Sequence, residues 1–584
     1  MRTRLLAITL FLLVASVHLR AATYSVCASG CNYTTLSAAN AAAVPGDIFE
    51  FENGTYVGAT LTVDGTAGNV ITYRVKTGHA ATINSTITLT NRDYITIGGT
   101  GQGFTITAGI SAACSAQGSF LTIRNNTITN ASGNIMISLC ADDVLISDNT
   151  ATGAAASDDF ANVYGSRIVV RNNVFQNALD PANHVDFFQS NCFALSNTIA
   201  SNYLLLENNR VENNTDANSH FYLNNLVSGD CPTTHATNIV IRHNQIDNIG
   251  SGFLYDVNVD KHKAYNNTIL DALGSAGWTV TWNSGGACTG CTLLNNLFKD
   301  AIGATGDAAV YYLKSGDGTS SGNYNLACGR LGTLCPASVT WLVGQIGGEA
   351  NGVRNQDPLL TGYTPEVTSP AIDAGGPLTT VAAADTGSGT SIVLTDAAFF
   401  QPGWAGTAGD FIAVGTVGNT VQISSINYGT NTATLAGSIA RNDGDSVWLY
   451  KDSDGTIVLK GSAPDIGAVE YQPAAPVITT ASPLPSVTVN TAYSTTISGT
   501  CTNTPCTWTS DIADAGACTG ITFTSTNSTM ATMGGTPTVT GTCSFNATTT
   551  DTLSLADTDA FIISVESVAS GSGGIGSRLR GVIR

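Results

Sequence analysis

A short pattern of alternating apolar and polar residues recurs along residues 121–298. In each copy the alternation closes on a polar pair whose second member is asparagine, and another apolar residue follows. Representative copies read LTIRNNTI (Leu121–Ile128), IVVRNNVF (Ile168–Phe175) and IVIRHNQI (Ile239–Ile246). Because a period of two places side chains on opposite faces of a strand, each copy predicts a β-strand with one buried face. Strand-like segments that recur and cannot bury this face alone are typical of a solenoid, in which the copies stack.

The closing asparagines are predicted to lie at a bend after each strand. Asparagine tolerates left-handed backbone and bonds locally, and asparagines stacked about 4.8 Å apart can also bond one another. Their spacings are 23, 24, 36, 35, 23 and 29 residues, so we expect constant strands, variable loops and a structural role for the asparagines. They are Asn126, Asn149, Asn173, Asn209, Asn244, Asn267 and Asn296.

A second series of strand-like segments lies between these copies and predicts another stacked sheet. Its aromatic residues, beside Asp, His and Asn, would suit sugar rings, which need apolar faces and partners for their hydroxyl groups. In the alternative, many of the aromatic rings point inward and fill the solenoid. The segments are Val185–Gln189, His220–Asn224, Phe253–Asp256, Trp278–Trp282 and Val310–Leu313. The candidate substrate-binding residues are Gln189, Tyr222, Asn224, Tyr255 and Trp282.

Composition narrows the classes of partner. The chain has 584 residues, a net charge of −19 and only 11% charged residues. This acidity argues against a nucleic-acid partner, and an anionic polysaccharide would need local cations or a bound metal at its site. At this length, a solenoid with extra domains is the natural division.

The N-terminus carries the features of an exported protein. Arg2 and Arg4 precede an apolar run, Leu5–Val17, and small residues follow at Ala21–Ala22. The run is too short for a membrane span, so residues 1–22 are predicted to be a signal peptide that is removed, and the chain to be secreted or held at the cell surface. No later segment reaches about 18 uninterrupted apolar residues, so we expect no membrane span.

Fourteen cysteines lie as close neighbours in sequence, and an even number in an exported chain favours disulfides, whose connectivity the sequence leaves open. Cys288 and Cys291 also form a CxxC pattern, which occurs in redox and zinc sites. Since no second such pattern lies nearby, we favour a structural disulfide. The neighbouring pairs are Cys27 and Cys31, Cys114 and Cys140, Cys192 and Cys231, Cys288 and Cys291, Cys328 and Cys335, Cys501 and Cys506, and Cys518 and Cys543.

The segment after the signal peptide supplies a helix and a first coil. Tyr33–Val44 is rich in alanine and is followed by PGDI (Pro45–Ile48) and NGTY (Asn53–Tyr56). We expect Thr34 or Thr35 to cap a short helix that ends at the Pro-Gly pair. This order resembles the start of pectate-lyase-like, right-handed parallel β-helix proteins. The resemblance implies that the helix covers an end of the solenoid, where core and strand edge would otherwise be exposed.

Two later phrases, SPAIDAG (Ser369–Gly375) and DIGAVEY (Asp465–Tyr471), resemble the closing coil of secreted bacterial β-helix proteins. The β-helix is therefore expected to span residues 23–375 and 465–471. Residues 376–464 would form a small inserted β module, with a barrel as one arrangement. Its strand-like runs are Ser391–Thr395, Asp410–Val414, Thr420–Ile426 and Ser446–Tyr450.

Beyond a linker at residues 472–476, residues 477–566 resemble an immunoglobulin-like domain family of bacterial surface proteins, and their strand spacing predicts a β-sandwich. Residues 567–584 are a Gly/Ser-rich spacer with a basic tail, for which export or surface attachment is one role. The matching residues are Ile478–Thr480, Leu484–Pro485, Tyr493–Ser494, Trp508, Gly535–Pro537, Gly541–Thr542 and Phe545. The predicted fold class is all-β: a single-stranded, right-handed parallel β-helix with a small inserted β module and a C-terminal β-sandwich.

Titratable residues gather on the longest coils. Five of the seven histidines lie within residues 184–262, where long loops on a rigid scaffold favour a site, with random clustering on a polar surface as the alternative. Asn183–Gln189 (NHVDFFQ) contains an H-x-D-x-x-Q phrase that resembles one in pectate-lyase-like β-helix proteins, where this part of the coil faces the substrate groove. The candidate catalytic residues are His184, Asp186, His220 and Lys261.

The segment DVNVD (Asp256–Asp260) is the candidate metal site. If the two valines point inward, Asp256, Asn258 and Asp260 share the outer face, and such alternating oxygen ligands can hold Ca²⁺. The stretch lacks the glycine and later glutamate of a helix–loop–helix calcium site, and a solvated polar face is the simpler interpretation. We predict no other cofactor.

Three functions remain open, each with a polysaccharide as the partner. A lyase must neutralise a uronate carboxylate and abstract the neighbouring proton, which the candidate His and Lys with a cation could do. A glycoside hydrolase needs two carboxyls about 5–5.5 Å or 6.5–9.5 Å apart, for which Asp159, Asp186 and Asp256 are candidates on stacked coils. A non-catalytic adhesin or glycan-binding protein is the third. No strict catalytic signature decides among them, and we favour lyase-like cleavage of a uronate-containing glycan.

Overall fold

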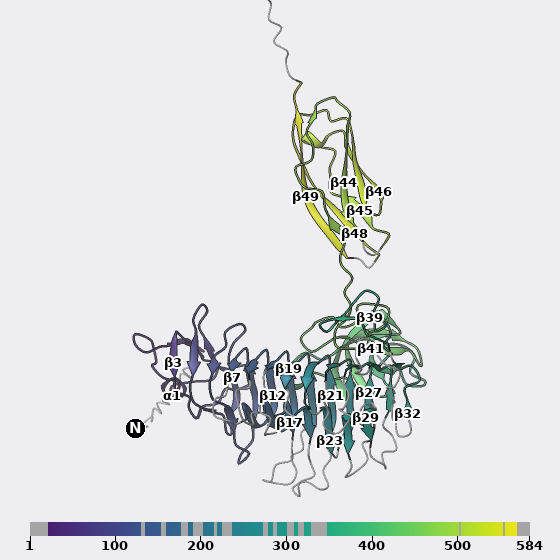
Figure 1. Ribbon diagram of the computed structural model, residues 1–584. Coiled ribbons are helices and arrows are strands. Elements are labelled where there is room, and N and C mark those ends of the chain that lie inside the picture. The colour runs from purple at the N-terminus through teal and green to yellow at the C-terminus, as the bar shows by residue number, and fades with distance from the viewer. Residues whose placement is uncertain are drawn as a thin grey trace, which may run out of the picture. The chain divides into compact units, whose positions relative to one another are not determined.

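In the computed structural model, the chain forms a parallel β-helix with a small barrel docked on it and, in a second unit, a β-sandwich (Figure 1). The two compact units are Met1–Tyr471 and Gln472–Arg584, so they divide where the linker was expected to begin. The residues that the structure describes are 21–129, 135–152, 159–176, 185–190, 202–214, 219–224, 236–250, 252–257, 259–271, 278–283, 289–300, 309–313, 321–328, 347–354, 356–501, 504–552 and 555–568.

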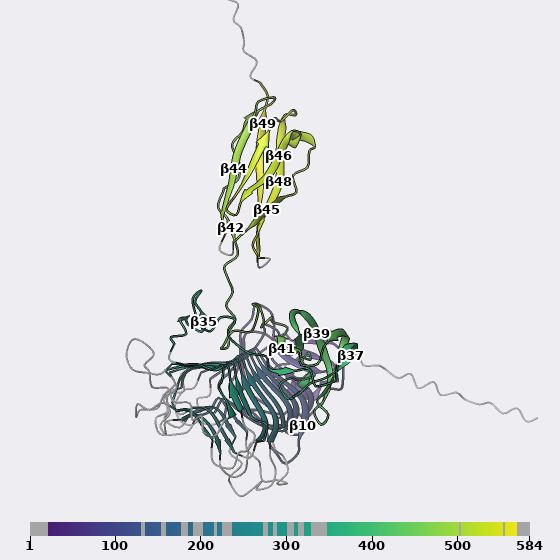
Figure 2. The ribbon, with the colours of Figure 1, turned by 90° about the vertical axis from the view of Figure 1, so that its right-hand side faces the viewer.

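The β-helix is built from parallel sheets that share its coils (Figure 2). We call the sheet before the asparagine bend the first sheet and the sheet after it the second sheet. The first sheet contains β1 (Thr23–Val26), β2 (Ile48–Phe51), β4 (Ile71–Val75), β7 (Asp93–Ile97), β10 (Gly118–Arg124), β12 (Ile137–Ser147), β15 (Ser166–Arg171), β18 (Asn202–Glu207), β21 (Ala236–Arg242), β24 (Val259–Tyr265), β27 (Thr292–Leu294), β30 (Ser321–Asn323) and β32 (Gly347–Gly348). The second sheet contains β3 (Gly54–Tyr56), β5 (Ala81–Ile83), β8 (Thr105–Ile106), β11 (Thr127–Ile128), β13 (Thr150–Thr152), β16 (Val174–Gln176), β19 (Arg210–Asn214), β22 (Gln245–Ile249), β25 (Thr268–Leu270), β28 (Leu297–Lys299), β31 (Leu326–Cys328) and β33 (Val353–Arg354).

The second series of segments forms a third parallel sheet, as predicted. The first half of β12 belongs to it, because Ile137–Cys140 pairs with β14 while Val144–Ser147 pairs with β15 of the first sheet. Its other strands are β6 (Ile87–Thr88), β9 (Ile110–Ala112), β14 (Ala161–Tyr164), β17 (Phe188–Ser190), β20 (His220–Asn224), β23 (Gly252–Val257), β26 (Trp278–Asn283) and β29 (Ala309–Leu313).

The closing asparagines form a buried ladder. From Asn126 to Asn325, each Nδ2 donates to the Oδ1 of the asparagine one coil further on, at 2.9–3.1 Å. The same Oδ1 also accepts a backbone N–H, as when Asn209 N donates to Asn244 Oδ1 at 2.9 Å. The last amide donates to Glu349 Oε1 at 2.6 Å. Since these polar groups are bonded within the solenoid, the asparagines are structural.

The left-handed residue of each bend is the one before the laddered asparagine. Asn125, Asp148 and Asn172 have φ of 57°, 58° and 56°, and His243 takes the same place with φ of 54°. Asn and Asp tolerate this backbone better than most residues. At each bend, the first residue of the pair therefore turns the chain and the second forms the ladder hydrogen bonds.

The interior of the solenoid is apolar and contains an aromatic column. Phe160, Phe187, Phe221 and Phe253 follow one another on successive coils, with ring centroids 5.0, 4.9 and 5.7 Å apart. All four are fully buried. The rings of this column, and those of Phe188 and Tyr222, thus lie inside, in line with the inward alternative, while Tyr164 is half-buried.

The N-terminal end of the solenoid carries the expected helix, α1 (Leu36–Ala41). Thr35 is its N-cap, since the hydroxyl accepts the N–H of Ala38 at 3.1 Å. Leu36 and Ala39 are buried in the same cluster as the solenoid core. The helix therefore covers apolar residues of the first coils, as the N-terminal phrase predicted.

The inserted module is a small antiparallel barrel that lies against the first sheet. A bridge between Val381 and Leu394 joins the two edge strands and closes the six-stranded sheet. Its apolar residues form one cluster with Val169, Leu205 and Val240 of the solenoid. The barrel strands in sheet order are β36 (Thr379–Thr380), β41 (Ser446–Lys451), β38 (Phe411–Val414), β39 (Thr416–Asn427), β40 (Thr432–Arg441) and β37 (Gly387–Val393), with a short 3-10 helix, η1 (Trp404–Gly406). A hairpin of β34 (Leu360–Thr361) and β35 (Thr364–Pro365) precedes it.

The second unit holds two four-stranded sheets around one apolar core. Trp508, Phe545 and Phe561 of one sheet pack with Ile497 and Met533 of the other. One sheet contains β42 (Val477–Ile478), β44 (Tyr493–Thr500), β47 (Met530–Gly535) and β46 (Ile521–Asn527). The other contains β43 (Val487–Thr488), β49 (Ala556–Glu566), β48 (Gly541–Thr550) and β45 (Thr507–Ser510), with a 3-10 helix, η2 (Gly516–Cys518).

Four of the neighbouring cysteine pairs are disulfides: Cys27 with Cys31, Cys114 with Cys140, Cys501 with Cys506, and Cys518 with Cys543. Cys291 and Cys328 each take part in a disulfide as well. Each of the three remaining predicted pairs includes at least one residue outside the described part of the chain. The signal-peptide prediction also falls outside it, at residues 1–20. Among the described residues, no helix has the length and apolar character needed to cross a membrane.

Candidate functional site

Three candidate residues occupy equivalent places on consecutive coils, at the start of β14, β17 and β20. Asp159 Oδ1 accepts the backbone N–H of Asp186 at 2.8 Å, and Asp186 Oδ1 accepts the backbone N–H of His220 at 2.8 Å. In each case the next residue is a phenylalanine of the buried column. The column therefore fixes the coil-to-coil register of this row, which we call the Asp–Asp–His row.

The imidazole of His220 lies beside the carboxylate of Asp186. Nδ1 is 3.4 Å from Asp186 Oδ1, and the Asp186 side chain is fully buried while that of His220 is 13% exposed. A carboxylate beside an imidazole can hold the ring in one orientation. This is the arrangement that a general acid or base needs, provided that the ring can reach a substrate.

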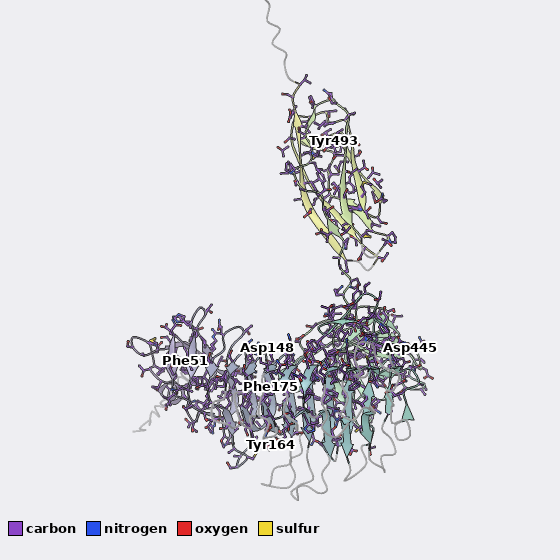
Figure 3. The ribbon with its side chains drawn as sticks, viewed as in Figure 1. Phe51, Asp148, Tyr164, Phe175, Asp445 and Tyr493 are labelled. Carbon is purple, nitrogen blue, oxygen red and sulfur yellow. A yellow bond between two sulfur atoms is a disulfide. The ribbon has the colours of Figure 1, made fainter. Side chains whose placement is uncertain are left out.

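Hydrogen-bonding side chains surround the Asp–Asp–His row on the third sheet. Asn162 Nδ2 donates to Asp159 Oδ2 at 3.2 Å and to Gln189 Oε1 at 3.1 Å. Tyr164 lies two residues further along β14, and burial together with the negative charge of Asp159 raises the pKa of its hydroxyl. In Figure 3, Tyr164 lies at the border of the solenoid opposite Asp148. We call Asn162, Tyr164 and Gln189 the polar flank of the row.

The two aspartates of the row also do structural work that recurs elsewhere in the solenoid. Asp142 Oδ1 accepts the N–H of Ser166 at 2.8 Å, and Asp260 Oδ1 accepts the N–H of Thr289 at 3.0 Å, each one coil further on. A side-chain oxygen that bonds the next coil is thus a common device of this chain. Hydrogen bonding alone does not mark Asp159 and Asp186 as functional. The contact between Asp186 and the ring of His220 is what sets this row apart.

The prediction that Asp256 lies on an outer, calcium-binding face is wrong. Its side chain is fully buried inside the solenoid, where Oδ2 lies 2.6 Å from His262 Nδ1. Asp260, on β24 of the first sheet, instead accepts the backbone N–H of Thr289. The chain passes from the third sheet to the first between Val257 and Val259, so the alternation assumed across this segment is broken. Asn258 lies outside the described residues.

Tyr222 also faces the interior and not a sugar-binding surface. The residue is fully buried, its hydroxyl is 2.9 Å from Ser190 Oγ, and its ring meets that of His262 edge-on at 5.7 Å. Because Ser190, Tyr222, Asp256 and His262 all lie among the apolar core residues, they form a polar cluster inside the coils. The prediction that Tyr222 contacts substrate is wrong.

Lys261 belongs to the barrel interface and not to the Asp–Asp–His row. Its Nζ donates to the backbone oxygen of Tyr428 at 3.3 Å, and the neighbouring Lys263 is 2.6 Å from Asp396. Both partners are residues of the barrel. The structure therefore does not bring Lys261 together with the candidate catalytic residues Asp186 and His220, since the lysine lies on the first sheet and the other two on the third.

The remaining predicted residues fall wholly or partly outside the described part. His184 is not among the described residues. Asn224, Tyr255 and Trp282 lie on β20, β23 and β26, and only their backbone is described. In the pairing of these strands, Asn224 is opposite Asp256, which is opposite Trp282. These predictions stay predictions.

Two members of the polar flank, Asn162 and Tyr164, are not among the residues predicted from the sequence. A signal was present, because Asp159-Phe160, Asp186-Phe187 and His220-Phe221 repeat a polar residue followed by phenylalanine at corresponding places in three coils. Aligning the coils on this phenylalanine would have placed Asn162 opposite Gln189, as the strand pairing does.

Among the described residues, the one cluster with metal-ligand geometry is Cys27, Cys31 and Glu52. The two cysteines form a disulfide with each other and so offer no thiolate to a metal. The acidic row and its flank have carboxylate and amide oxygens of the type that Ca²⁺ prefers.

No family model matches the chain, and no curated protein matches it in sequence. It is similar to the crystal structure of pectate lyase Pel9A, at 14% sequence identity over 77% of this chain and 96% of that chain, with a TM-score of 0.36. It is also similar to two structures of the PL6-family alginate lyase AlyGC. One, of a variant, has 13% identity over 57% of this chain and 54% of that chain, with a TM-score of 0.26. The other has 13% identity over 49% and 50%, with a TM-score of 0.21.

Proposed function

We propose that the chain acts on a polysaccharide at the Asp–Asp–His row, by lyase-like cleavage of a uronate-containing glycan. The observation that carries the proposal is the contact of the His220 ring with buried Asp186 on a row whose polar flank can bond sugar hydroxyl groups. Proton abstraction beside a uronate carboxylate requires a base that is partly exposed and held in one orientation. His220 takes this role, since Lys261 lies at the barrel interface.

The charge of the site sets a condition on this chemistry. Asp159 and Asp186 place two carboxylates one coil apart, and a uronate adds a third negative charge. A divalent cation bound through oxygen ligands would offset that repulsion and withdraw charge from the uronate carboxylate. We therefore propose calcium as the cofactor to test, at this row and not at Asp256.

A non-catalytic glycan-binding role is the second candidate function. It is favoured by the hydrogen bonds from Asp159 and Asp186 to the backbone of the next coil, which tie both carboxylates to structure. The polar flank would then bind sugar without cleavage. A third outcome, hydrolysis, is raised by the separation of one coil, about 4.8 Å, because retaining hydrolases place their carboxyls about 5–5.5 Å apart.

The experiment incubates the full chain with polygalacturonate, alginate and a neutral glucan, with Ca²⁺ or with chelator. Ultraviolet absorbance reports the unsaturated ends that a lyase leaves, and reducing-end release reports cleavage of either kind. We expect unsaturated ends from a polyuronate, with at least a hundredfold lower rate in His220→Gln, since general acid–base catalysis contributes about 10²–10⁴-fold. His79→Gln is the matched control, because His79 bonds the backbone N–H of Asn53 far from this row.

Each result assigns the function. Reducing ends without absorbance would replace the lyase proposal with hydrolysis. Retention of a glycan without cleavage would favour the binding protein. Unchanged cleavage in His220→Gln would show that the row is not the site, and no cleavage or retention of any polysaccharide would overturn the proposal.

A further inference from the structure

The outer face of the first sheet is divided into a covered and an uncovered part. Along one row of paired positions, the residues are Thr72, Thr96, Thr122, Leu145, Val169, Leu205 and Val240. The last three are buried against the barrel, whereas the threonines precede it. In Figure 1 the barrel strands β39 and β41 lie over the later coils and leave β7 uncovered. The early coils thus present an open surface.

An exposed aromatic pair marks this open surface. Tyr94 and Phe120 stack with centroids 4.5 Å apart and rings within 7° of parallel, and Phe120 is 40% exposed. Both have left-handed backbone near the start of their strands. Tyr203 has the same backbone at the corresponding bend four coils after Tyr94. Tyr203, however, is covered by Trp404 of the barrel, at 5.6 Å. An aromatic ring exposed to water lacks the favourable free energy of burial. An aromatic pair left outside the barrel therefore suggests a ligand that stacks on it.

Charged side chains lie one coil beyond Phe120. Asp142 pairs with Ser119, the residue before Phe120. Arg167, on the coil after that, binds Asp143 through Nε and Nη2, both at 2.8 Å. The side chains of Arg167 and Asp142 are 42% and 38% exposed. They can donate to and accept from the hydroxyl groups of a sugar whose ring lies on Phe120.

An arginine without an acidic partner lies at the other end of the same strand. Arg124 is partly exposed, and its Nε makes a long bond of 3.4 Å to Asn125 Oδ1. Within the described part of the chain it has no salt bridge, whereas nearby Arg74 is paired with Glu50 and Arg92 with Asp64. In a chain of net charge −19, such an arginine is available to a carboxylate from outside.

We propose that Tyr94, Phe120 and Arg124 on the uncovered coils, with Asp142 and Arg167 where the barrel begins, form a second polysaccharide-binding surface on the first sheet, selective for glycans with carboxylates. A sugar ring stacks on the aromatic pair and a uronate carboxylate binds Arg124. The span from Phe120 to Arg124 is about 13 Å along the strand, which exceeds one sugar ring. This surface anchors the polymer on a different sheet from the Asp–Asp–His row, so it does not depend on catalysis at that row.

Affinity electrophoresis of the full chain through gels containing polygalacturonate, alginate or neutral hydroxyethyl cellulose tests the proposal. We expect a polyuronate to retard the wild type and Phe120→Ala to raise its Kd at least fivefold, while Phe120→Trp keeps the affinity. Arg124→Gln should weaken binding to the polyuronates alone. Val57→Ala removes another exposed apolar side chain and Arg210→Gln another exposed arginine, on the second sheet, so both controls should bind as the wild type does.

The outcomes separate this surface from the proposed active site. His220→Gln should lose cleavage and keep retardation, whereas Phe120→Ala should lose retardation and keep cleavage of short oligosaccharides. The proposal is overturned if no gel retards the wild type, if Phe120→Ala matches Val57→Ala, or if Arg124→Gln matches Arg210→Gln.

Discussion

Arg242 of the β-helix and Asp410 of the barrel form a buried two-point ion pair, although 168 residues separate them in sequence. Nη1 lies 2.7 Å from Oδ2 and Nη2 lies 2.7 Å from Oδ1, and neither side chain is exposed. Arg242 Nε also donates to Glu207 Oε2 at 2.6 Å, and Nη1 donates to the hydroxyl of Tyr265 at 2.9 Å. One buried cation thus holds a carboxylate from each side of the interface.

Removing one partner of this pair should destabilise the interface strongly. In Asp410→Ala, the guanidinium of Arg242 stays buried with one carboxylate fewer, and breaking a buried pair typically costs about 3–5 kcal/mol. Chemical unfolding of the Met1–Tyr471 unit within the full chain measures the loss. Asp357→Ala is the control, since its pair with Lys299 is about one-third exposed and should contribute less than about 1 kcal/mol. Equal losses in the two variants would contradict the structural role of Arg242.

The asparagine ladder should tolerate loss of a rung poorly. Asn209 donates through Nδ2 to Asn244 Oδ1 at 3.0 Å and to Val170 O at 2.8 Å, while its Oδ1 accepts from Asn173. Asn209→Ala leaves several buried groups without partners, and each costs about 1–3 kcal/mol, so a loss of roughly 3 kcal/mol or more is expected.

The control for the ladder is Asn84→Ala. Asn84 is exposed, and its substitution should change stability by less than about 0.5 kcal/mol. Thermal unfolding followed by circular dichroism compares the two variants. A loss in Asn209→Ala no larger than in Asn84→Ala would show that the ladder adds nothing beyond the coils themselves.

The fold could be predicted because its signal is local and repeated. From Asn126 to Asn296, a strand of period two is followed by a polar pair that ends in asparagine, and the two members of the pair make the bend and the ladder, as Asn125 and Asn126 show. Each coil buries one strand face and bonds one asparagine amide against the adjacent coils only. The same contacts repeat along the solenoid, so one copy of the pattern predicts the next.

The site could be predicted less well because it depends on where the chain leaves one sheet for the next. The alternation of inward and outward side chains holds within a strand but not across the bend between β23 and β24. Continuing it across this bend placed Asp256 on the outer face, whereas its side chain points inward. Likewise, assigning Lys261 to the site required knowing which sheet its strand joins. Loops of unequal length hide both facts from a single sequence.

The docked barrel did leave a signal that alternation overlooked. The coils at Ile168–Val170, Leu204–Leu206 and Ile239–Ile241 are apolar at three successive positions, whereas Leu121–Ile123 has Thr122 in the middle. A strand that is apolar on both faces is typical of a sheet covered on both sides. The switch from Thr122 to Leu145, which packs against the barrel cluster, therefore marks where the cover begins.

Stability at the barrel interface should depend on the charge of Asp452. Burial, followed by the charge of Glu207, raises the pKa of this carboxyl from 3.8 to about 8. A raised folded-state pKa means that the folded chain retains a proton that the unfolded chain has lost. This group's contribution is thus fully present below about pH 4 and is lost as pH rises to about 8, at up to about 1.4 kcal/mol per pH unit.

Asp452→Asn isolates that contribution, because asparagine keeps an oxygen for Asn208 Nδ2 and cannot ionise. We expect the variant to gain stability over the wild type as pH rises from about 4 to about 8. His243, whose pKa burial lowers to about 3, costs the wild type and the variant the same stability below pH 6.5. Urea unfolding at several pH values gives the difference. A difference that does not change with pH would show that Asp452 is ionised in the folded chain.

Loss of one member of the interior pair of Asp256 and His262 should destabilise the solenoid. Both side chains are fully buried and their contact is 2.6 Å, so His262→Leu removes a partner from a carboxylate inside the core and should cost about 3–5 kcal/mol. The double variant Asp256→Leu with His262→Leu should recover part of that loss, because it removes the uncompensated polar group. A double-mutant cycle measures the coupling. If instead the two losses simply add, and Ca²⁺ stabilises the wild type but not Asp256→Leu, then Asp256 faces outward as a metal ligand, and its placement inside the solenoid is wrong.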